Sequence, residues 1–148
     1  MIDKNLLAPC GLYCGACGVI VAYRDDNRKL KEILAQTYGS TPGEVICHGC
    51  MSEVRFKYCR TCDIRSCVLE KNYEGCYQCD DFPCRRIHDF SDPVGRQVML
   101  RAVPEWRRLG TEKWVEAEEK RYSCPACGAR VLRGSSRCRA CKEPLNLD

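Results

Sequence analysis

Apolar side chains other than cysteine are scarce in this 148-residue chain. The apolar fraction of 45% includes fifteen cysteines, and without them about a third of the residues are apolar. The shortage is greatest over residues 47–84, where eight cysteines stand beside only six Val, Ile, Leu or Phe side chains. So few apolar groups do not offset a backbone ordering cost of roughly 1–2 kcal/mol per residue. An ordinary hydrophobic core is therefore excluded for this segment.

Long hydrophobic runs are also missing. No stretch reaches the roughly 18 apolar residues of a transmembrane helix, and the N-terminal residues lack the apolar run of a signal peptide. We therefore expect a cytoplasmic protein without membrane contact, in a compartment where thiols stay reduced or bind metal. The odd number of cysteines is incompatible with a complete set of intrachain disulfides.

Familiar catalytic patterns are absent. The chain has two histidines, and no Ser/His/Asp order, phosphate-binding glycine loop or paired-carboxylate motif stands out. The sequence thus predicts a non-enzymatic protein that acts through contacts with other proteins. A thiol-dependent enzyme is the alternative, because a thiolate beside a metal or a helix N-terminus is reactive.

What the chain does contain is Cys-x-x-Cys. Two thiolates at this spacing on a tight turn can bind one ion, and two such pairs complete a tetrahedral zinc site. Twelve of the fifteen cysteines form six pairs: Cys14/Cys17, Cys47/Cys50, Cys59/Cys62, Cys76/Cys79, Cys124/Cys127 and Cys138/Cys141. The sequence therefore predicts a fold organised by several Zn²⁺ ions.

The clearest pattern lies at the C-terminus. Cys124-Pro-Ala-Cys127-Gly is followed, after ten residues, by Cys138-Arg-Ala-Cys141, which resembles the short zinc-ribbon class. Four nearby arginines, Arg130, Arg133, Arg137 and Arg139, are candidate nucleic-acid contacts. The simpler interpretation is that they solvate a small domain and offset the charge of its thiolates.

The eleven cysteines of residues 1–90 allow several pairings. We predict one site from Cys14, Cys17, Cys47 and Cys50, and a second from Cys62, Cys67, Cys76 and Cys79. Three cysteines remain as further metal ligands or redox thiols: Cys10, Cys59 and Cys84. Four thiolates also suit an iron–sulfur cluster, so an iron–sulfur or thiol redox protein is an alternative for this region.

Helical patterns surround these cysteines. Leu30, Ile33, Leu34 and Tyr38 predict a helix over residues 26–38, with Asp26 at its start and Gly39 at its end. Residues 91–121 are also expected to be helical, with a break at Pro104. Short helices are expected after Cys67 and after Cys84.

The cysteine-rich part resembles a known family. Ala8-Pro-Cys10-Gly-Leu-Tyr-Cys14-Gly-Ala-Cys17 and two copies of Cys-x2-Cys-Asp-x3-Cys, at 59–67 and 76–84, are similar to the prokaryotic Domain of Unknown Function 3795 family over about residues 5–90. This resemblance implies metal binding and no particular reaction.

Together these patterns predict a small α+β protein organised by metal ions. We expect a Cys-rich zinc-knuckle domain with short helices at residues 1–90, a helical linker packed on it at 91–121, and a zinc ribbon at 122–148. The expected partner is a protein, with nucleic acid as the alternative.

Overall fold

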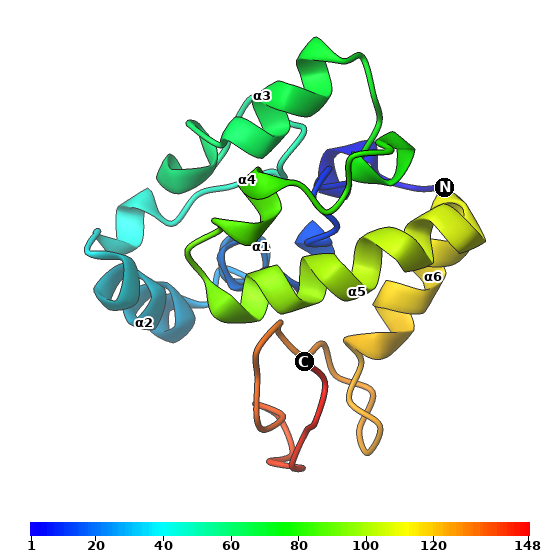
Figure 1. Cartoon of the computed structure of the whole chain (residues 1–148). Helices are drawn as coiled ribbons and strands as arrows, with labels where there is room; N and C mark the ends of the chain where they lie inside the picture. Colours follow the sequence, from blue (N-terminus) through cyan, green and yellow to red (C-terminus); the bar gives the residue numbers. More distant parts are fainter.

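The computed structural model describes all residues, 1–148, and its regular structure is helical (Figure 1). Six α-helices and five short 3-10 helices follow one another: η1 (Lys4–Leu6), η2 (Cys14–Ala16), α1 (Gly18–Arg24), α2 (Arg28–Tyr38), η3 (Pro42–Glu44), η4 (Lys57–Cys59), α3 (Asp63–Glu70), η5 (Cys76–Gln78), α4 (Arg85–His88), α5 (Pro93–Leu109) and α6 (Thr111–Arg121). None of these helices is long and apolar enough to cross a membrane.

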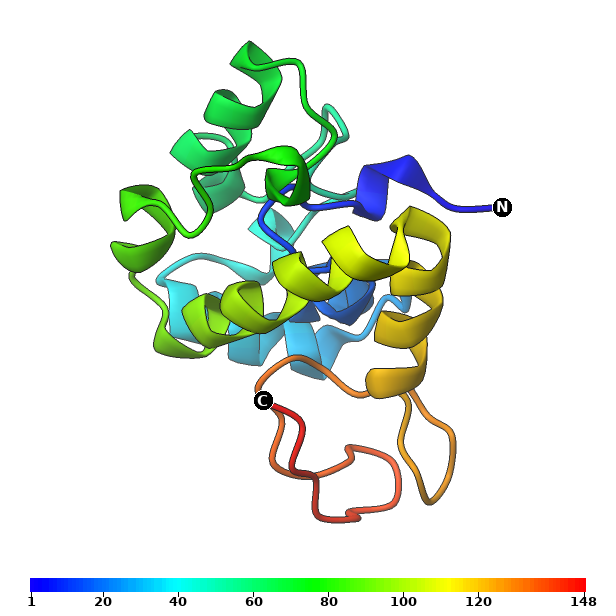
Figure 2. The same cartoon turned by 45° about the vertical axis from the view of Figure 1, so that its right-hand side comes forward.

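The expected α+β class is not confirmed, because the chain forms no β-sheet. Its β pairing consists of two isolated antiparallel bridges, between Ser123 and Arg130 and between Arg137 and Pro144. Both bridges belong to the C-terminal segment, and neither extends into a named strand. Figures 1 and 2 show this segment as loops beside the α5–α6 pair.

Aromatic stacking joins the two long helices to the cysteine-rich part. The rings of Trp106 on α5 and Trp114 on α6 stack with centroids 4.1 Å apart, and both side chains are fully buried. Tyr13 meets Trp114 edge-on, and Tyr77 of η5 lies 4.6 Å from Trp106. Residues 91–121 are therefore part of the main core.

A close approach of the N-terminal segment to α5 requires glycine at position 11. Gly11 has a φ of +86°, which is unfavourable for other residues. A Cβ at this position would lie 3.1 Å from side-chain atoms of Ala102 and Val103. The turn that contains Gly11, between Cys10 and Cys14, thus lies directly against the middle of α5.

Two local predictions were wrong. The expected helix 26–38 starts later, at Arg28, because Asp26 has a φ of +45° and Asn27 supplies the cap, accepting a 3.0 Å bond from the Leu30 N–H. The expected break at Pro104 does not occur, since α5 runs through it. Burial of Val103 and Trp106 offsets the backbone hydrogen bond that proline removes.

Candidate metal centre

The first knuckle of the C-terminal segment is a compact hydrogen-bonded turn. The Cys124 N–H donates to the Ala129 carbonyl at 2.8 Å, and the Gly128 N–H donates to the Cys124 carbonyl at 2.8 Å. Gly128 has a φ of +74°, a conformation that glycine adopts without strain. The Cys-x-x-Cys-Gly sequence thus fixes the direction of both thiols locally.

The second knuckle repeats the same geometry. The Cys138 N–H donates to the Glu143 carbonyl and the Lys142 N–H to the Cys138 carbonyl, both at 2.9 Å. Lys142 occupies the position equivalent to Gly128 and has a φ of +67°. A non-glycine residue in this conformation is uncommon, which indicates that the turn is imposed by its surroundings.

The four thiols of the two knuckles converge on one point. The sulfur atoms of Cys124, Cys127, Cys138 and Cys141 all lie within 4.8 Å of one another. The Sγ atoms of Cys124 and Cys141 are 3.6 Å apart, and those of Cys127 and Cys138 are 3.7 Å apart. A tetrahedral site with Zn–S bonds of about 2.3 Å requires sulfur separations of about 3.8 Å. This group could therefore hold a single metal ion.

The Cys138 thiol has a lowered pKa and ionises readily. The backbone amide of Cys141 lowers the pKa of the Cys138 thiol to about 6, with further help from the Ala140 amide and the neighbouring thiols. Against the effect of the Glu143 amide, burial and hydrogen bonds with the other three thiols raise the pKa of Cys141 to about 12, so Cys138 is the first of the two to ionise. A metal ligand must be a thiolate, so a lowered pKa favours ligation. Cys124 and Cys138 are buried, whereas Cys127 and Cys141 are exposed.

Arginines attach this segment to the rest of the chain. The Arg133 backbone N–H donates to the Ala16 carbonyl at 3.0 Å, and its guanidinium donates to the Tyr13 carbonyl at 3.2 Å. Arg130 forms an ion pair with Glu119, which also accepts a hydrogen bond from the Tyr13 hydroxyl. Two of the four candidate nucleic-acid contacts therefore bond within the protein, while Arg137 and Arg139 are exposed.

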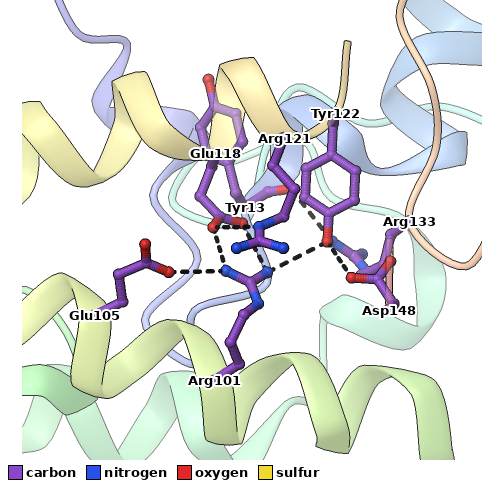
Figure 3. A network of polar contacts seen from close by, with 8 residues as sticks. All are labelled: Tyr13, Arg101, Glu105, Glu118, Arg121, Tyr122, Arg133 and Asp148. Carbon is purple, nitrogen blue, oxygen red and sulfur yellow. Dashed lines mark hydrogen bonds and ion pairs between the residues drawn. The ribbon is translucent and has the colours of Figure 1, made fainter. Parts of the chain in front are cut away.

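A buried carboxylate links α5, α6 and the C-terminus (Figure 3). Glu118 is fully buried and accepts hydrogen bonds from Arg101 on both of its oxygens. Arg101 also lies 3.5 Å from the Tyr122 hydroxyl, which donates to Asp148 at 2.8 Å. Sequence reasoning missed this network, because a glutamate on a charged helix is normally solvated.

The first predicted N-terminal set is only partly brought together. The Cys50 N–H donates to the Cys14 sulfur at 3.4 Å, and the Gly49 N–H donates to the Cys47 sulfur at the same distance. Burial, followed by the charges of Cys50 and Cys17, raises the pKa of the Cys14 thiol. The convergence within 4.8 Å that marks the C-terminal group does not extend to this set.

The second predicted set is divided by the structure. Cys67, Cys76 and Cys79 line one cavity, and the fourth cysteine on its wall is Cys84. Cys62, at the N-cap of α3, is not among the lining residues. The repeat carried a signal for this arrangement, because Cys84 occupies the position in the second copy that Cys67 occupies in the first.

Cys62 instead shares an environment with Cys10 and Cys59, two of the three remaining predicted thiols. Burial raises the pKa of Cys10 to about 11 and of Cys59 to about 12, and the charge of Cys62 adds to both shifts. Burial also raises the pKa of Cys50, with contributions from Cys10, Cys59 and Cys62. Such thiols are neutral unless a bound cation compensates their ionisation.

Comparison with known proteins gives a family for this chain. The profile of a family described as "Protein of unknown function (DUF3795)" matches residues 6–89, which is more than half of the sequence. The chain therefore belongs to the DUF3795 family, as its motifs suggested. Comparisons with curated proteins and with solved structures give no match.

Proposed function

We propose that this DUF3795 protein binds zinc through its C-terminal knuckles and uses the ion to build a structural ribbon. The observation that carries the proposal is the convergence of four thiols, with sulfur separations of 3.6 and 3.7 Å. These separations match the tetrahedral geometry that zinc adopts with four cysteines.

The donor set supports a structural role for the ion. A catalytic zinc site keeps one coordination position open for water or substrate, whereas four cysteines close the shell. Four thiolates around Zn²⁺ also leave a net charge of about −2, which does not favour activation of a bound water. The ribbon is therefore proposed to be non-enzymatic and to present a fixed surface.

Metal analysis of the whole chain tests this proposal. Protein purified without oxygen should contain ribbon zinc, and the double variant Cys127→Ser/Cys141→Ser should contain one zinc fewer per chain. Ala126→Ser is the matched control, since it places a serine on the same exposed loop without removing a ligand. An unchanged zinc content in the double variant would contradict the proposal.

A group of aromatic rings favours a protein as partner. Tyr38, Phe56 and Tyr58 pack together with centroids 5.3–5.8 Å apart, and Tyr58 is 57% exposed. Exposed tyrosines are enriched at protein interfaces, where they contribute a large contact area at low entropic cost. A protein that co-purifies with wild type should be lost in Tyr58→Ser and retained in Arg139→Ala.

Nucleic-acid binding rests on fewer residues. With Arg130 and Arg133 engaged internally, Arg137 and Arg139 are the exposed members of the original four. Retention on a polyanion column that falls steeply with salt and disappears in Arg137→Ala/Arg139→Ala would favour nucleic acid over a protein partner.

A further inference from the structure

A second group of four cysteines surrounds an internal space. Cys67 on α3, Cys76 and Cys79 at the ends of η5, and Cys84 at the N-cap of α4 line a cavity of about 90 Å³. Cys76 is buried and the other three are half-buried. These four thiols come from three elements, and the fold brings them to one place independently of the C-terminal knuckles.

The spacing of these thiols differs from that of the ribbon. The ribbon sulfurs are within 4.8 Å of one another, whereas no three of the cavity's thiols form such a group, a wider spacing that they share with the first N-terminal set. One zinc ion with Zn–S bonds of about 2.3 Å would require the closer spacing. In a four-iron cluster, each thiolate binds a different iron, so the sulfurs stay farther apart around a metal–sulfide core.

The residues around the cavity suit the metal–sulfide core of a four-iron cluster. Five of the eight other lining residues are apolar or aromatic, and Ile64, Val68 and Ile87 are nearly or fully buried. The remaining three are charged: Lys71, Asp81 and Arg86. The Lys71 ammonium donates to the Cys79 sulfur at 3.5 Å. An apolar wall shields a cluster from solvent, and a cation bonded to a ligand sulfur offsets the negative charge of the thiolates.

The η5 turn is held in place by hydrogen bonds to other parts of the chain. Arg107 of α5 donates to the Tyr77 and Cys79 carbonyls, both at 2.7 Å. The Cys76 N–H donates to the Pro9 carbonyl at 2.8 Å, and a Cβ on Gly75 would meet the Trp106 ring at 2.8 Å. The positions of Cys76 and Cys79 are therefore fixed by the main core.

The geometry points to an iron–sulfur cluster bound by Cys67, Cys76, Cys79 and Cys84. This assignment replaces Cys62 of the sequence-based set with Cys84. It is independent of the zinc proposed for the ribbon, because the two sites share no residue and contain different metals.

Iron, sulfide and zinc analysis of the full chain, purified without oxygen, tests the assignment. Wild type should be brown and carry about four irons and four acid-labile sulfides at this site. Cys67→Ser and Cys84→Ser should each lose this amount, and the double variant should lose no more than either single one. Leu69→Ser, an exposed change on α3, should keep the iron.

The zinc content of the same samples separates this assignment from the ribbon proposal. Ribbon zinc should remain in Cys84→Ser, which also shows that the variant is folded there. A colourless wild-type protein that contains zinc and no iron would overturn the assignment. Additive iron loss in the double variant would also overturn it, since it would place Cys67 and Cys84 in different sites.

Alkylation of the native protein gives a test that needs no variant. The four cavity thiols should resist iodoacetamide while the cluster is bound and become reactive together when a chelator removes the iron in the presence of a reductant that keeps the thiols reduced. Rapid labelling of any one of them in the intact brown protein would contradict the assignment.

Discussion

Loss of metal ligation in the ribbon should unfold residues 122–148 while the helices remain folded. The double variant Cys127→Ser/Cys141→Ser changes two exposed side chains, so it removes ligands without opening a cavity in the core. The metal contribution lost is about 10–16 kcal/mol in comparable small sites, as large as the whole stability of a typical domain. The cluster of buried apolar residues that would have to replace it has only five members: Ala16, Tyr122, Cys124, Val131 and Cys138.

Hydrogen exchange followed by mass spectrometry measures this effect locally. The knuckle amides of Cys124, Gly128, Cys138 and Lys142 should lose their protection, because their hydrogen bonds exist only in the closed turns. The amides of α5 should keep theirs, since α5 packs in the larger core. Ala126→Ser should match wild type. Native protection of the knuckle amides in the double variant would refute the reasoning.

Three further predictions concern polar contacts. Glu118→Gln should lower the free energy of unfolding by about 3 kcal/mol in denaturant titrations. This is the lower end for a broken buried pair, because Arg101 is 27% exposed and keeps a second carboxylate partner. Tyr13 and Arg130 lower the pKa of Glu119 despite partial burial, so Glu119→Gln should destabilise at neutral pH, and its effect should fade as the pH drops through that lowered pKa. Arg107→Leu should accelerate loss of the brown colour in air, because the η5 turn loses both bonds.

The same helices and cysteine region offer controls for these variants. Glu116→Gln removes an exposed carboxylate from α6 and should leave stability within about 0.5 kcal/mol of wild type. Arg108→Leu, next to Arg107, should not change the rate at which colour is lost. If Glu118→Gln behaves like Glu116→Gln, the buried network does not contribute to stability as argued.

Local chemistry made the ribbon predictable from the sequence. Each knuckle is closed by hydrogen bonds within about five residues, so the spacing of Cys124, Cys127 and the following glycine specifies the turn by itself. The ten-residue interval then brings Cys138 and Cys141 opposite the first pair. No distant part of the chain is needed to predict that these four thiols meet.

The arrangement of the N-terminal thiols depends on tertiary packing and could not be predicted in the same way. Cys62 and Cys67 both belong to the α3 region, but Cys67 lines the cavity beside η5 and Cys62 does not. The spacing of the cysteines in the sequence is equally compatible with Cys62 or Cys67 lining this cavity. Pro104 illustrates the same limit, since burial of its neighbours overrides the local preference for a break.

The basic residues of this chain have a common structural role that its net charge conceals. Arg65 donates to the Cys50 carbonyl at 2.9 Å, and Lys71 and Arg107 bond the sulfur and the carbonyl of Cys79. Arg133 donates to the Tyr13 carbonyl, beside the Cys14/Cys17 pair. Burial lowers the pKa of Arg133, but the charges of Cys17 and Cys14 outweigh this effect and raise it.

Cations placed in this way hold the knuckle backbone and counter the negative charge that thiolates acquire on binding metal. The formal charge of +4 counts those thiols as neutral, so it overstates the positive field of the metal-bound protein. The proposed metal sites would therefore account for part of the basic surplus, and of the four candidate arginines only Arg137 and Arg139 are exposed to an external polyanion.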